Sequence, residues 1–86
     1  MDQDFPNVMD GSYVVQFRQV ATSKILDTDL NLVIGNKQKV YLIYLSLDSA
    51  KAYVSKVLRS NPTVEALIFN AKKERVELLS PVLETF

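Results

Sequence analysis

Residues of alternating character mark the first patterned stretch of the chain, which begins after residue 11. One parity is apolar or aromatic throughout: Tyr13, Val15 and Phe17. The other parity is more polar: Val14, Gln16 and Arg18. Successive side chains of a strand point to opposite sides of a sheet, so this period of two predicts a strand with one buried and one wet face. We expect the first parity to face the core.

A second alternation leads into an apolar run. Leu30, Leu32 and Ile34 alternate with other residues, and the stretch 35–38 then offers glycine, asparagine and polar residues suited to a turn. The run that follows, 40–45, reads VYLIYL and contains no polar residue. The pattern predicts a hairpin that joins these two segments.

Apolar residues change to helical spacing after residue 46. They form one stripe: Leu47, Ala50, Val54, Val57 and Leu58. Ser46 can cap the helix by accepting from a free backbone N–H of the first turn, and Asp48 suits the positive end of the helix dipole. Asn61 precedes Pro62, and proline disfavours the α conformation in the residue before it. A helix over about 47–60 is therefore expected.

Two further strands are expected after the helix. Residues 64–69 are strongly apolar, with Glu65 as the only charge, and residues 75–79 alternate, with Val76 and Leu78 expected to face the core. A polar turn separates the two strands, and Pro81 ends the second.

This order of elements predicts a two-layer α+β fold, in which a mostly antiparallel sheet of about five strands carries one helix on one face. Residues 1–11 have no periodicity and are expected to form a flexible leader, followed by a single domain over 12–86. The helix is long enough to serve as a crossover that makes the strands at 40–45 and 64–69 parallel.

The runs 40–45 and 64–69 are apolar on both parities, which suits central strands that are covered on both faces. One helix covers only one face. Ala66 suits close packing against the helix and Glu65 suits a rim, so the opposite parity is expected to lie away from the helix. The four candidate interface residues are therefore Tyr41, Ile43, Leu67 and Phe69.

Four such side chains are worth roughly 1.5–3 kcal/mol each when buried, which together rivals the net stability of a small domain. The face that carries them is therefore expected to be covered by a second copy of the chain or by a protein partner. The alternative is that the leader, in which Phe5, Val8 and Met9 could dock on the domain, or the C-terminal segment PVLETF folds back over it.

Composition narrows the chemistry. The chain has 86 residues, of which 48% are hydrophobic, and it contains no cysteine, histidine or tryptophan. Disulfides, thiolate catalysis and Cys-ligated zinc are excluded, and no serine has an imidazole to activate it. Because no motif places the acidic residues for catalysis, we expect no enzyme, no cofactor and no small-molecule substrate.

One segment partly matches a calcium loop. Asp27, Asp29 and Asn31 occupy its first three ligand positions, but Leu32 stands where glycine is needed and Gln38 where a bidentate glutamate is needed. We therefore interpret the segment as a polar turn and expect no metal.

The charge of the chain and its targeting signals give little information about its partners. The formal net charge is zero, although residues 1–31 are acidic by three charges and residues 32–86 basic by three. The start of the chain lacks the pattern of a signal peptide, and no apolar run approaches the ~20 residues that span a bilayer, so a cytoplasmic protein without membrane contact is expected.

A nucleic-acid-binding module is the alternative function. The helix and the late turn hold the local excess of basic residues: Lys51, Lys56, Arg59, Lys72, Lys73 and Arg75. Such residues could contact phosphates, and Tyr41 or Phe69 could stack on bases if exposed. The zero net charge disfavours this function relative to a protein interface.

Overall fold

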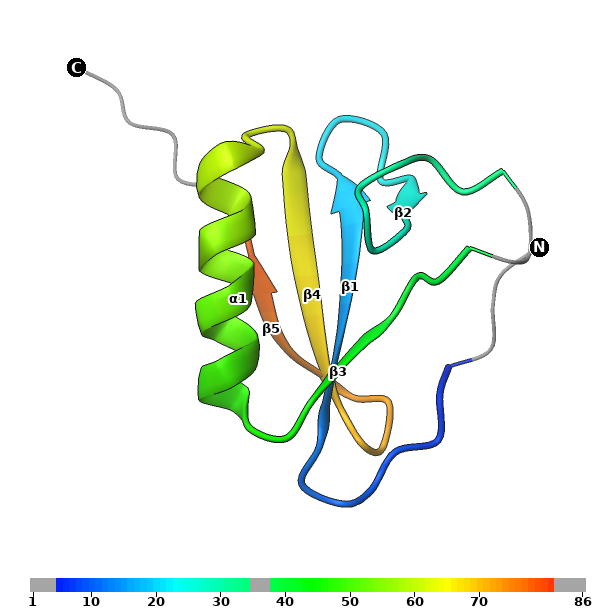
Figure 1. The fold of residues 1–86 in the computed structure, drawn as a ribbon, viewed down its shortest axis with the longest axis vertical. Helices are drawn as coiled ribbons and strands as arrows, with labels where there is room; N and C mark the ends of the chain where they lie inside the picture. Colours follow the sequence, from blue (N-terminus) through cyan, green and yellow to red (C-terminus); the bar gives the residue numbers. More distant parts are fainter. Residues whose placement is uncertain (1–4, 35–37, 82–86) are drawn as a thin grey trace.

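The computed structural model describes residues 5–34 and 38–81. Its elements follow one another as β1 (Tyr13–Gln19), β2 (Ile25–Leu26), β3 (Leu42–Tyr44), α1 (Leu47–Ser60), β4 (Val64–Asn70) and β5 (Arg75–Leu79). The five strands form one antiparallel sheet, and α1 runs along one side of it (Figure 1). The predicted two-layer α+β fold is confirmed, and the predicted bounds of α1 and β5 agree with the structure.

The sheet is built around β1. Its strand order is β2-β1-β4-β5, and β4 pairs with the whole length of β1. The other edge of β1 is shared, because β3 pairs with Tyr13, Val14 and Val15 while β2 pairs with Phe17 and Arg18. The prediction that residues 40–45 form a central strand is therefore wrong: β3 is a short edge strand, and β1 and β4 occupy the middle.

The central position of β1 also explains why the predicted exposure of Val14 is wrong. Val14 was expected on a wet face, but its side chain is 0% exposed. Both neighbours of Val14 are apolar, since it pairs with Ile43 of β3 and with Phe69 of β4. β1 lies in the middle of the sheet with apolar neighbours on both sides, so its parity does not separate buried from exposed positions.

The predicted crossover is right about the relative direction of the two strands, but they are not neighbours in the sheet. Both β3 and β4 run antiparallel to β1, so they point the same way, and α1 connects them. The two strands do not pair, however, because β1 lies between them.

Helix α1 is fixed at both ends by the residues that the sequence indicated. The hydroxyl of Ser46 accepts a hydrogen bond from the backbone N–H of Ser49 at 3.1 Å. At the other end, the side-chain amide of Asn61 donates to the carbonyl of Val57 at 2.7 Å, and Pro62 follows. These contacts satisfy backbone groups that a helix otherwise leaves without partners.

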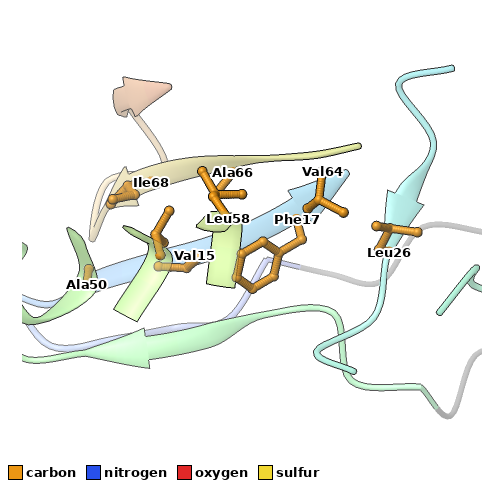
Figure 2. Packing of buried hydrophobic residues seen from close by; sticks show 9 residues of the cluster. Val15, Phe17, Leu26, Ala50, Leu58, Val64, Ala66 and Ile68 are labelled. Atoms are coloured by element: carbon orange, nitrogen blue, oxygen red, sulfur yellow. The ribbon is translucent and has the colours of Figure 1, made fainter. Parts of the chain in front are cut away.

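The core lies between α1 and the sheet. Figure 2 shows its buried side chains in one layer, with contributions from the helix and from three strands. The cluster consists of Val15, Phe17, Leu26, Ala50, Val54, Leu58, Val64, Ala66 and Ile68. The parity predicted for β4 is thus confirmed, since its residues at 64, 66 and 68 face the helix.

Aromatic rings extend this core. The ring of Tyr53 lies 6.4 Å from that of Phe17 and 5.8 Å from that of Tyr44, measured between centroids. Removal from water, and then the neighbouring Tyr53, raise the pKa of the Tyr44 hydroxyl.

Two sequence predictions about loops and faces are wrong. Residues 30–34 form no strand, and only an isolated bridge joins Leu26 to Leu32. In β5, Val76 and Leu78 do not face the core. Leu78 pairs with Leu67 on the face away from α1, whereas Leu79 packs against the helix-side cluster.

Some predictions concern residues outside the described ranges. These are the turn at 35–37, the first four residues of the leader, and the apolar residues of the C-terminal segment at 82–86. Residues 5–11 of the predicted leader are described and carry neither helix nor strand.

Candidate interaction surface

The outer face is the face of the sheet that α1 does not cover. Because Ala66 and Ile68 point to the helix, Leu67 and Phe69 of the same strand point to the outer face. Cross-strand pairing then assigns neighbours to the same face: Val14 and Ile43 lie beside Phe69, and Gln16 and Leu78 lie beside Leu67. The outer face is therefore largely apolar across β3, β1, β4 and β5.

The four predicted interface residues differ in exposure. Leu67 is buried, and Tyr41 and Phe69 are partly buried. Ile43 alone among them is strongly exposed. The structure thus brings all four toward one face, but only Ile43 is open to a partner in this conformation.

Phe5 accounts for part of this difference. Its ring meets Tyr41 edge-on, with centroids 5.5 Å apart, and meets Phe69 edge-on at 5.6 Å. Phe69 belongs to β4, and Tyr41 directly precedes β3, so the two rings flank β1 from opposite sides. Phe5 therefore lies across β1 and covers part of the outer face near the turn between β4 and β5, as the leader alternative anticipated.

A cation completes this aromatic contact. The ammonium of Lys73, in the turn between β4 and β5, lies 5.9 Å from the centroid of the Phe5 ring. That distance is within the range in which a cation is attracted by the face of an aromatic ring. The contact links the turn between β4 and β5 to the leader, whose Phe5 lies on the outer face.

Three apolar side chains remain open on the outer face beside this cover. Ile43 is 51% exposed, Leu78 46% and Val76 40%. Val76 and Leu78 are not among the four predicted interface residues, because their parity in β5 was expected to face the core. The signal that could have found them is the charge of Arg75 and Glu77, which marks β5 as an edge strand and not as a central one.

An ion pair occupies the end of the outer face that lies away from the turn between β4 and β5. Arg18 of β1 and Glu65 of β4 are direct cross-strand partners, and the Nε–H of Arg18 donates to Oε2 of Glu65. Glu65 was expected at an exposed rim, but it is buried. The guanidinium satisfies the carboxylate, which makes this burial tolerable.

The calcium-like segment is a closed turn in the structure. One carboxylate oxygen of Asp27 accepts from the backbone N–H groups of Asp29 and Asn31, both at 2.9 Å. The other accepts from the side-chain amide of Gln38 at 2.7 Å. The carboxylate that would bind a cation is thus committed to the chain itself.

These hydrogen bonds also set the charge of Asp27. The N–H of Asn31 first, then Gln38 and Asp29, hold the pKa of the Asp27 carboxyl below its ordinary value of 3.8, against the opposing effect of desolvation. Across residues 5–34 and 38–81, no three acidic side chains gather in a way that could hold a metal ion.

The basic residues of the nucleic-acid alternative are spread over the molecule. Lys51 pairs with Glu77 at 3.7 Å, and Lys73 lies over Phe5. Arg59 stands in the last turn of α1, at the opposite end of the molecule from the turn that carries Lys72 (Figure 1). This distribution gives the alternative no support, and it stays an untested prediction.

An open depression of about 340 Å³ lies between the turn at Gly11 and the turn between β4 and β5. Asn70 in its wall is engaged locally. Its side-chain oxygen accepts from the N–H groups of Lys72 and Glu74, and its amide donates to the Glu74 carboxylate at 2.9 Å. These hydrogen bonds stabilise the turn. The polar atoms of Asn70 therefore serve the turn itself and do not form a binding site in the depression.

Comparison of the chain with protein-family models, with curated proteins and with solved structures finds no match. Within the described part of the chain, no helix has both the length and the apolar content needed to cross a membrane.

Proposed function

We propose that this chain is a non-catalytic module that forms a homodimer through its outer face. The observation that carries the proposal is the three exposed apolar side chains on that face, Ile43 on β3 at one edge of the sheet and Val76 and Leu78 on β5 at the other. An apolar patch with a polar rim is typical of an interaction surface, and the two-fold homodimer is the commonest way to cover one. The zero net charge of the chain adds no overall repulsion between copies.

The size of the face indicates a weak dimer. Four strands at a spacing of about 4.8 Å, of which β1 and β4 are the longest at seven residues, give a face of at most roughly 19 by 23 Å, or about 440 Å². A standard interface buries about 800 Å² on each partner. The dimer is therefore expected to dissociate in the micromolar range or above, and its assay must reach high protein concentrations.

The outer face is a better candidate than the free edge of the sheet on the side of β4. Strand β5 forms that edge, and its pairing register with β4 shifts at Phe69, which pairs with Arg75 and leaves Val76 without a partner residue. A bulge and charged residues on an edge strand oppose the addition of another strand. Stacking of two outer faces does not meet this obstacle.

The test is the solution mass of matched variants, measured by light scattering from about 10 µM to about 1 mM, a range that brackets the weak association expected for such a face. Leu78→Lys places a charge on the outer face. Leu32→Lys is its control, because Leu32 is equally exposed at 46% and pairs with Leu26 on the helix side. Circular dichroism shows whether each variant keeps its fold.

The expected result is a wild-type mass that rises from 9.7 kDa toward twice that value. Leu78→Lys should remain a monomer, and Leu32→Lys should behave as the wild type. A wild-type chain that stays monomeric throughout, or two lysine variants that lose association equally, would contradict the proposal.

A further inference from the structure

Phe5 occupies the part of the outer face that a second copy needs. It lies between Tyr41 and Phe69, which are aromatic side chains of the kind enriched at protein interfaces. Resting on the proposed homodimer, we infer that Phe5 is a displaceable cover: it competes with the second copy for this aromatic surface and so sets the strength of dimerisation.

The way Phe5 is attached makes it displaceable. Residues 5–11 form neither helix nor strand, and Met9 in this segment is exposed. The segment ends in a local turn, where the N–H of Ser12 donates to the carbonyl of Met9 at 3.0 Å. That bond does not depend on where Phe5 lies. Release of the ring therefore breaks ring contacts and leaves the pairing of β1 intact.

The area of the outer face explains why release matters. The whole face offers only about half of what a standard interface buries on each partner. With Phe5 in place, Ile43, Val76 and Leu78 remain exposed while the two aromatic rings are partly buried. Withdrawal of Phe5 adds the faces of Tyr41 and Phe69 to the available surface. The open chain is therefore the better dimerising form.

The observed affinity then depends on how often the cover is open. Both copies must be open to dimerise, so the apparent dissociation constant of the dimer rises in inverse proportion to the square of the open fraction. The cation of Lys73 over the Phe5 ring shifts this equilibrium toward the closed form.

The first experiment removes the cover. Phe5→Ala is compared with Met9→Ala, a control in the same segment whose side chain is exposed. Phe5→Ala should dimerise about tenfold more tightly, which is what a shift from a mostly closed to an open chain produces. Met9→Ala should match the wild type. The double variant Phe5→Ala/Leu78→Lys should return to a monomer, which distinguishes dimerisation on the outer face from aggregation.

A second experiment follows the cover directly. The chain contains no tryptophan, so Phe5→Trp introduces a single fluorescent reporter. Its emission should shift to longer wavelength as the protein concentration rises, because the ring leaves the sheet for solvent when the dimer forms. A shift to shorter wavelength would mean that residue 5 becomes part of the interface, which overturns the inference.

The outcomes separate the inference from the proposed function. If the wild type dimerises, Leu78→Lys does not, and Phe5→Ala dimerises no more tightly than the wild type, the homodimer stands and the cover is refuted. If the wild type is a monomer up to the highest concentration, the homodimer itself fails, whatever Phe5→Ala does. Should Phe5→Ala lose its fold, Lys73→Ala provides the same test with a smaller gain in affinity.

Discussion

The ion pair between Arg18 and Glu65 offers a quantitative test of how the outer face is built. The side chains are 28% and 11% exposed, so the pair is neither at the open surface nor fully buried. Exposed pairs contribute about 0–1 kcal/mol, whereas removing one partner of a buried pair costs about 3–5 kcal/mol. An intermediate cost is expected, and it should differ between the two partners.

Arg18→Met is the more damaging of the two changes. It retains the apolar stem and leaves the Glu65 carboxylate buried without its guanidinium, which should cost about 2–3 kcal/mol of unfolding free energy. Glu65→Met leaves the more exposed Arg18, whose long side chain can turn to water, and should cost only about 1 kcal/mol. The double variant places two apolar residues side by side and should lie within about 1 kcal/mol of the wild type.

Urea unfolding of all four proteins provides the measurement. It is run at a protein concentration low enough to keep the chain monomeric, and the free energies form a double-mutant cycle. The coupling expected between the two positions is at least about 2 kcal/mol, with the double variant more stable than Arg18→Met. Additive losses, within about 0.5 kcal/mol, would show that the pair is solvated and that the outer face does not bury Glu65.

Three further predictions concern the rest of the fold. Ile68→Val should lower the free energy of unfolding by about 1 kcal/mol, because Ile68 is fully buried, whereas Ile34→Val at an exposed position should change it by less than about 0.5 kcal/mol in the same urea experiment. Ser46→Ala should cost about 1 kcal/mol by thermal unfolding through loss of the helix cap, and equal stability of variant and wild type would refute the capping role. The pKa of Asp27 is lower in the folded chain than its ordinary 3.8, so its carboxylate stabilises the fold above about pH 4 and this contribution is lost as the pH falls further. The melting temperature of the wild type should therefore fall more steeply between about pH 5 and pH 2 than that of Asp27→Asn, and parallel curves would contradict the assignment.

The helix and the strand that follows it could be predicted because their signals are local. Ser46 and Asn61 bound α1, and both act on backbone groups within four residues. The parity of β4 also follows from sequence, since Ala66 has the small side chain that a close helix needs. Such features depend on the spacing of residues that are close together along the chain, and this spacing is read directly from the sequence.

The candidate surface could be predicted only in part. Alternation in β4 places Leu67 and Phe69 away from the helix, and the structure agrees. Sequence could not show that Phe5 returns across β1 to cover Phe69, because that contact joins residues 64 positions apart. It also could not show which strand lies at the edge, so Val76 and Leu78 were assigned to the wrong face.

By itself, then, the sequence determined the fold class, the bounds of the helix and the absence of cysteine and histidine chemistry. Strand order was decided only by the tertiary structure, because a strand's own pattern reports whether its faces are apolar and not which neighbours cover them. Val14 and Ile43 illustrate the difference. They are adjacent partners and both aliphatic, yet Val14 is buried in the central strand and Ile43 is exposed on the edge strand.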